Sequence, residues 1–119
     1  MPERFNPQFW TLLDELVKQS SVVIDRPHNT AHPEWDNLIY PLDYGYLAGT
    51  TSSDGAGIDV WIGASGEKQV RGVICTVDLV KRDSEIKVLL GCTEDEMHTV
   101  TSFHSQGGSM GCFLIRRED

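Results

Sequence analysis

The chain has 119 residues, of which 39% are hydrophobic and 24% are charged, and its formal net charge is −8 at pH 7. This length fits one domain with one core, so we predict a single domain over residues 1–119. The negative charge argues against a general affinity for nucleic acids or anionic membranes, because both require a positive surface. An anionic substrate stays compatible, since bound divalent metal ions can reverse the local charge.

The first predicted element is a helix over residues 7–18. Asn6-Pro7 is a typical helix start. Apolar side chains follow at the 3.6-residue period of an amphipathic helix, namely Phe9, Leu12, Leu13, Leu16 and Val17. A strand is expected at residues 22–24. From Asp25 to Asn37 the chain is rich in proline, histidine and asparagine without a period, which predicts a long ordered loop.

Beyond Leu38 the sequence indicates short strands separated by glycine-containing turns. The predicted strands cover residues 44–49, 57–63, 69–80, 85–91 and 110–115. Thr93 and Glu96 match a capping box, which predicts a helix over residues 94–103. Short antiparallel strands flanked by helices predict a mainly β (α+β) fold, a small closed or partly open barrel over residues 22–115.

The three cysteines, Cys75, Cys92 and Cys112, each lie in an apolar stretch. We interpret them as reduced, buried thiols. The N-terminus shows no apolar region of the signal-peptide type, and no stretch reaches the length of a membrane span. These features predict a cytoplasmic protein without a membrane partner.

Four aspartates recur at short spacing near predicted strand ends: Asp54, Asp59, Asp78 and Asp83. A single one of them is adequately explained as a turn or cap residue. All four together are harder to explain in that way, because Asp78 interrupts an apolar run. If they converge, they need a compensating cation, and an oxygen-rich site suits Mg²⁺ or Mn²⁺ rather than zinc. Two such ions are a common clamp for a phosphoryl group.

Three tyrosines fall within seven residues at even spacing, so Tyr40, Tyr44 and Tyr46 share a face if the segment is extended. We interpret Tyr46 as a core residue. For Tyr40 and Tyr44 two interpretations stay open: an aromatic ladder in the core, or hydroxyl donors to a phosphate.

The order and spacing of these segments resemble the soluble family I inorganic pyrophosphatases. The resemblance extends from about residue 22 to residue 91. It rests on the motifs Ile39-Tyr-Pro-Leu-Asp-Tyr-Gly-Tyr46, Asp54-Gly-x-x-Ile-Asp59 and Asp78-x4-Asp83. It implies a five-stranded barrel of the OB type, hydrolysis of pyrophosphate to two phosphates with Mg²⁺ (or Mn²⁺), and assembly into a homo-oligomer.

The resemblance also implies roles for individual residues. The metal ligands would be Asp54, Asp59, Asp78 and Asp83. The catalytic residues would be Asp54, Asp59 and Tyr44, and Tyr40 and Tyr44 would bind the substrate. Because the family's lysines are missing, we predict Arg26 and Lys87 as further substrate-binding residues. Asp25 would stand in for a glutamate of the family's site.

The sequence departs from the family pattern at several positions. Ala56 replaces the middle aspartate of the turn, a residue thought to help deprotonate the attacking water, and Gly57 replaces a proline. Glu85 stands where the family has a lysine, with Lys87 as the nearest substitute, and the longer C-terminal region of the family is missing. Losing one general base lowers a rate by roughly a hundred- to ten-thousand-fold, so we expect slow turnover.

Two other functions remain as alternatives to hydrolysis of a phosphoanhydride. The first is a catalytically impaired relative that binds metal or phosphate in a regulatory or assembly role, which the departures favour. The second is an OB-type nucleic-acid binder, which the acidic charge disfavours. His28 and His32 are interpreted as ordinary surface histidines.

Overall fold

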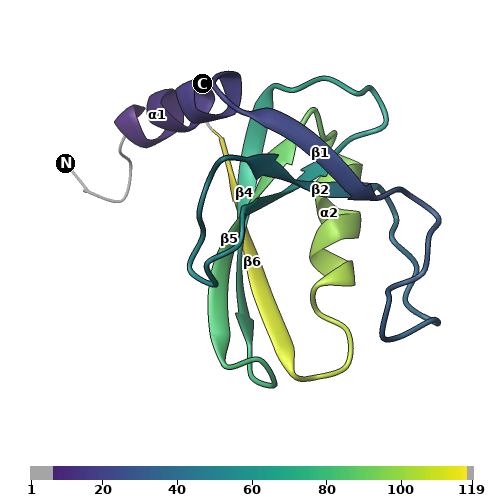
Figure 1. The fold of residues 1–119 in the computed structure, drawn as a ribbon. Coiled ribbons are helices and arrows are strands. Elements are labelled where there is room, and N and C mark those ends of the chain that lie inside the picture. Colours follow the sequence, from purple (N-terminus) through teal and green to yellow (C-terminus); the bar gives the residue numbers. More distant parts are fainter. Residues whose placement is uncertain (1–6, 118–119) are drawn as a thin grey trace.

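The computed structural model describes residues 7–117, which form a curved sheet of six strands and two helices (Figure 1). This confirms the predicted mainly β class with flanking helices. The elements are α1 (Pro7–Lys18), β1 (Ser21–Arg26), β2 (Asp43–Ala48), β3 (Ile58–Ile62), β4 (Val70–Asp78), β5 (Asp83–Leu90), α2 (Glu94–Phe103) and β6 (Met110–Arg116).

Both helices begin and end as the sequence predicts. At the start of α2, the Glu96 N–H donates to the Thr93 hydroxyl at 3.2 Å, and the Thr93 N–H donates to the Glu96 carboxylate at 2.9 Å. This reciprocal capping box satisfies two N–H groups that a helix start otherwise leaves without partners. No helix among residues 7–117 is both long and apolar enough to cross a membrane.

The sheet has the strand order β1-β2-β3-β5-β4-β6, so β1 and β6 are its two edges. The expected barrel was five-stranded and closed or partly open; the structure has a sixth strand, and its sheet is open. The pairing of β3 with β5 is parallel, with Val60 opposite Val88, and the other pairings are antiparallel. A parallel pair needs a crossover connection, and residues 63–82, which include β4, supply it.

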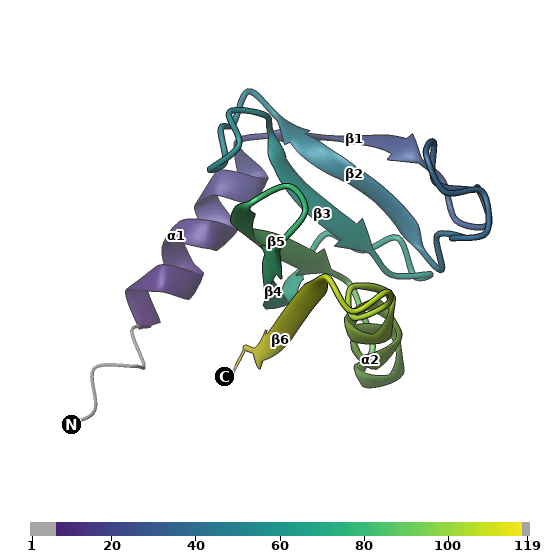
Figure 2. The same ribbon diagram turned by 90° about the horizontal axis from the view of Figure 1, so that it is seen from below.

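Side chains alternate across the strands, and each face of the sheet packs against one helix (Figure 2). On the α1 face the core consists of Val17, Leu47, Val60, Ile62, Val70, Val88 and Leu90. On the α2 face it consists of Tyr40, Trp61, Ile74, Leu89, Cys92, Met97 and Val100. The second face carries the polar groups described below, so α2 and the apolar cluster beneath it hold the site in place.

The loop between β1 and β2 is ordered, as predicted from its composition (Figure 1). An antiparallel bridge joins Ala31 to Ile39, and the His32 N–H donates to the Leu38 carbonyl at 2.8 Å. Just after the loop, β2 lies so close to β1 that a Cβ at Gly45 would be 1.8 Å from the Val23 carbonyl oxygen. Only glycine fits there, and this close approach fixes the neighbouring tyrosines of β2.

Candidate metal and phosphate site

Strand β5 carries three charged side chains at alternate positions. Asp83, Glu85 and Lys87 therefore point to the same face of the sheet. Their neighbour two residues further, Leu89, belongs to the core beneath α2, which places the three charged groups on the α2 face. The alternation of a strand thus gathers two acids and one base on one line.

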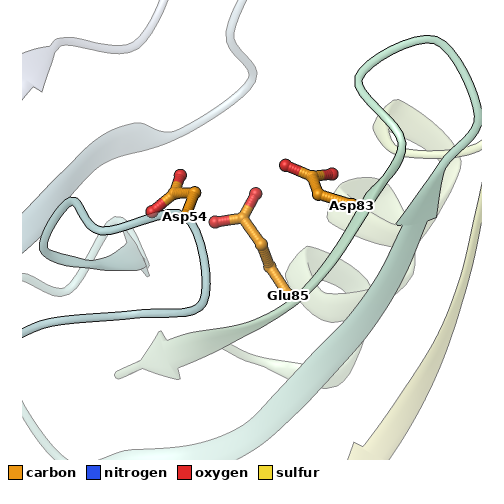
Figure 3. Close-up of side chains that lie close together, drawn as sticks. All are labelled: Asp54, Asp83 and Glu85. Atoms are coloured by element: carbon orange, nitrogen blue, oxygen red, sulfur yellow. The ribbon is translucent and has the colours of Figure 1, made fainter.

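Asp54 reaches the same place from the turn between β2 and β3. Carboxylate oxygens of Asp54, Asp83 and Glu85 lie within 4.8 Å of one another, and Figure 3 shows the three side chains close together, with Glu85 between the other two. We call these three residues the carboxylate cluster. The Asp54 carboxylate accepts hydrogen bonds from the Ser52 hydroxyl (2.6 Å) and the Ala56 N–H (2.9 Å), which lower its pKa and keep it ionised.

The other two members of the carboxylate cluster are poorly compensated. Among the described residues, Asp83 Oδ1 is the buried side-chain oxygen that lacks a hydrogen-bond partner. The pKa of Glu85 is raised, first because burial removes water from its carboxylate and then because Asp59, Asp54 and Asp83 are also acidic, while Lys87 opposes the shift. A buried carboxylate oxygen without a donor, facing two further carboxylates, fits a hard divalent cation with oxygen ligands.

A second group of polar side chains lies beside the carboxylate cluster, and its positive and negative charges balance each other. Lys87 Nζ donates to Asp59 Oδ2 at 2.7 Å and to the Tyr44 hydroxyl at 2.9 Å, and the Tyr44 hydroxyl donates to Asp59 Oδ2 at 2.6 Å. Burial and the adjacent Asp59 raise the pKa of Tyr44, so its phenol stays protonated. We call Tyr44, Asp59 and Lys87 the lysine network. Lys87 also lies 3.6 Å from Glu85 and so links the network to the carboxylate cluster.

Asp78 lies at the end of β4 and organises the turn into β5. Its Oδ1 accepts hydrogen bonds from the N–H groups of Val80 and Lys81, both at 3.0 Å. It stands opposite Asp83 in the register of the two strands. Of the four aspartates that the sequence analysis predicts as ligands, Asp54 and Asp83 therefore meet, Asp59 is bound by Lys87, and Asp78 caps a turn.

A cleft of about 480 Å³ opens from Glu85 along the α2 face. Three cationic side chains line it, those of Arg26, Lys81 and Lys87. The guanidinium of Arg26 donates to the Tyr40 hydroxyl at 2.5 Å, which fixes one predicted substrate-binding residue against another. The lining also contains Asp78 and one member of the carboxylate cluster, Glu85, and this mixture of cationic and acidic groups suits a phosphate that arrives with a divalent cation.

Several residues lie elsewhere than their predicted roles would require. Asp25 is exposed and does not line the cleft. His28 is exposed, as expected, and contacts Asp43 through its backbone N–H at 2.9 Å. His32 differs from the surface interpretation, because it is half-buried, packs against Trp35 and lines the cleft. The three cysteines are free, with Cys92 buried and the other two half-buried.

Glu85 is the member of the carboxylate cluster that sequence reasoning missed as a site residue. Its replacement of a lysine reads as the loss of a site cation, and only the structure shows the carboxylate turned toward Asp54 and Asp83. One signal was present in the sequence: Asp83, just before the strand predicted over residues 85–91, is evenly spaced with Glu85 and Lys87, which places all three on one face if the strand begins two residues earlier.

The fold is similar to that of solved inorganic pyrophosphatases. One is the inorganic pyrophosphatase of Helicobacter pylori, with a TM-score of 0.59, 15% identity and coverage of 82% of each chain. A second is the inorganic phosphatase of Anaplasma phagocytophilum, with a TM-score of 0.56, 17% identity, and coverage of 80% of this chain and 81% of the other. A third is the inorganic pyrophosphatase of Coxiella burnetii, with a TM-score of 0.50, 16% identity, and coverage of 82% and 84%.

No family model matches the sequence, and no curated protein matches it significantly. At 15–17% identity the likeness to the solved structures concerns the fold. It agrees with the resemblance drawn from the tyrosine and aspartate motifs. This chain has the fold of the inorganic pyrophosphatases.

Proposed function

We propose that this protein hydrolyses inorganic pyrophosphate to two phosphates with the help of Mg²⁺ or Mn²⁺. The observation that carries the proposal is the carboxylate cluster, with its buried, unpartnered Asp83 oxygen, whose member Glu85 also lines a cleft with three cationic side chains. The fold that it shares with solved pyrophosphatases supports the same reaction.

The cation would be held by Asp54, Asp83 and Glu85. When bound there, Mg²⁺ or Mn²⁺ supplies positive charge for phosphoryl oxygens and acidifies a water molecule. Asp59 and Asp78, which the resemblance implies as further ligands, are not among the carboxylates that lie within 4.8 Å of one another, and one oxygen of each already accepts two hydrogen bonds. We therefore assign both of them to positioning: Asp59 holds Lys87 and Tyr44, and Asp78 holds the turn that precedes Asp83.

The remaining residues of the site act on the substrate. Arg26 and Lys81 face the cleft and neutralise phosphate oxygens, with Tyr40 orienting the guanidinium of Arg26. Tyr44 stays protonated and serves as a hydrogen-bond donor rather than a base. Lys87 is 6% exposed and its charge is shared by Asp59 and Glu85, so it stabilises the site more than it attracts the substrate.

The test is phosphate release from pyrophosphate with Mg²⁺ and, separately, with Mn²⁺. Wild type should release phosphate only with metal, and Asp83→Asn should be slower by roughly a hundredfold or more. Ala56→Asp should be faster than wild type, because it restores the carboxylate that the family pattern has in this turn, next to Asp54. Asp95→Asn makes the same chemical change at an exposed position of α2 and serves as the control. Metal-independent release, or no release in any variant, would refute the proposal.

A catalytically impaired protein that binds metal and phosphate is the second candidate. The lysine network favours it, because Lys87 Nζ already donates hydrogen bonds to two protein groups, Tyr44 and Asp59. The absence of a carboxylate at Ala56 points the same way. Metal-dependent binding of pyrophosphate without release of phosphate would establish this second function. A cytoplasmic location, a single domain and assembly into a homo-oligomer stay predictions from the sequence.

A further inference from the structure

The cleft that begins at Glu85 has an aromatic part that a bare pyrophosphate would not use. Its volume of about 480 Å³ falls within the range of roughly 300–1,000 Å³ that is usual for organic ligands. Trp35, Leu38 and Phe103 line it together with the cationic side chains. Pyrophosphate is covered by charged oxygens and has no apolar surface, so an apolar wall contributes nothing to its binding.

Trp35 is the residue of this wall that offers a ligand the most open aromatic surface. Its side chain lines the cleft although the residue is 53% exposed, an unusual state for the largest apolar side chain. The ring of His32 packs against it, with ring centroids 4.7 Å apart, and the Leu38 N–H donates to the Trp35 carbonyl at 3.0 Å. The indole is thus held in place by an ordered loop while much of its surface stays open to a ligand.

Polar groups suited to a heterocyclic ring lie in the same lining. Asn37 and Gln106 face the cleft, and each amide offers both donors and an acceptor. Such amides pair with the donor and acceptor edge of a base. Cations for phosphates, an open aromatic ring for stacking and amides for a ring edge therefore occur together in one cleft.

We infer that the cleft takes an organic phosphoanhydride that carries a planar heterocycle, as a nucleoside diphosphate does, with the heterocycle stacked on Trp35. The inference rests on the proposed function, because it names the substrate class of that same site. In the reaction, a water oxygen bonds to the terminal phosphorus while the bond from that phosphorus to the bridging oxygen breaks. The bridging oxygen leaves with the nucleoside monophosphate, and the other products are phosphate and a proton released to water.

The test compares two ligands that cannot be hydrolysed and that differ only in the nucleoside. One is methylenediphosphonate, and the other is the adenosine diphosphate analogue with a methylene group in place of the bridging oxygen. Affinities are measured by calorimetry with Mg²⁺ for the full chain. We expect wild type to bind the nucleoside analogue at least about fivefold more tightly, since stacking of one base on an aromatic side chain contributes roughly 5- to 150-fold.

Variants assign the difference to the indole. Trp35→Ala should reduce the ratio of the two affinities by roughly 5- to 150-fold, and Trp35→Phe should give an intermediate ratio because it keeps a ring. Phe113→Ala removes an aromatic side chain that is 60% exposed on β6 and does not line this cleft, and its ratio should equal that of wild type. Circular dichroism confirms that each variant is folded.

The outcomes separate this inference from the proposed function. Equal affinities for the two ligands in wild type, or an unchanged ratio in Trp35→Ala, would overturn the inference, and pyrophosphate turnover in the same preparation would leave the proposed function standing. A high ratio of the two affinities that depends on Trp35, without turnover of pyrophosphate, would support the inferred ligand class and refute the proposed hydrolysis of pyrophosphate.

Discussion

Two neighbouring groups of charged residues on the α2 face differ in how their charge is balanced. In the lysine network the carboxylate of Asp59 has a lysine 2.7 Å away and a phenol donor at 2.6 Å. In the carboxylate cluster three acids lie within 4.8 Å of one another, and one buried oxygen of Asp83 has no donor. The difference shows that the lysine network balances its charges within the protein, whereas in the carboxylate cluster Lys87 approaches only Glu85, and one Asp83 oxygen lacks a donor among the described residues; we propose that a cation supplies the missing charge.

The largest effect is expected from breaking the lysine network. Lys87→Met leaves Asp59 without its counter-charge, and the side chains of the pair are only 6% and 23% exposed. Removing one partner of a buried pair is costly, and with Asp59 partly exposed we expect a loss of about 2–4 kcal/mol in the free energy of unfolding. Urea denaturation measures it.

The double variant Lys87→Met with Asp59→Asn provides the control for that measurement. Because it removes both charges, it should recover most of the lost stability. A double variant as unstable as the single one would show that Lys87 stabilises the protein through packing. The claim that the lysine network balances its own charges would then be wrong.

The next effect concerns the carboxylate cluster and the cation. A ligand that binds only the folded state adds stability, about 2.7 kcal/mol when its concentration is a hundredfold above the dissociation constant. Wild type should therefore be stabilised by Mn²⁺, and Asp83→Asn should lose this gain. Thermal unfolding with and without Mn²⁺ checks it, with Asp95→Asn as the surface control. Equal stabilisation of all three proteins would place the cation elsewhere.

A pH dependence follows from Glu85, whose pKa is raised by burial and by the acids around it. The folded state then holds a proton that the unfolded state releases above its ordinary value of about 4.3. This contribution to stability is present below that pH and is lost as pH rises through the raised pKa. Without metal, Glu85→Gln should gain stability relative to wild type as pH increases from 4 to 8, as measured by urea denaturation with a chelator. A stability difference between Glu85→Gln and wild type that does not change with pH would contradict the raised pKa of Glu85 in the cluster.

The smallest effect is expected at Asp78. Asparagine keeps an oxygen that can accept from the Val80 and Lys81 amides, so Asp78→Asn should cost less than about 1 kcal/mol of stability. Its Mn²⁺ affinity, measured by calorimetry, should stay within about threefold of wild type. A larger loss of affinity would restore Asp78 to the ligand set that the pyrophosphatase resemblance implies.

Much of this fold follows from local signals in the sequence. The apolar period of α1 and the capping box of Thr93 and Glu96 define helices whose bounds the structure confirms. These signals depend on neighbours along the chain. The parallel pairing of β3 with β5 does not depend on neighbours along the chain, because β4 lies between them in sequence but outside the pair in the sheet.

The site was predictable only in part, for a similar reason. Asp54 and Asp83 meet as predicted from their motifs, but nothing local shows that Lys87 lies 2.7 Å from Asp59, a residue 28 positions earlier. That contact turns a predicted ligand into half of an ion pair. The third member of the carboxylate cluster is instead Glu85. The sequence indicated only that a family lysine is missing at this position.

The most direct test is a crystal structure of the protein soaked in Mn²⁺, with anomalous diffraction used to locate the ion. A peak bounded by Asp54, Asp83 and Glu85, with Lys87 still on Asp59, is the predicted result. A peak between Asp59 and Asp78, or density without any ion at the three carboxylates, would contradict the account.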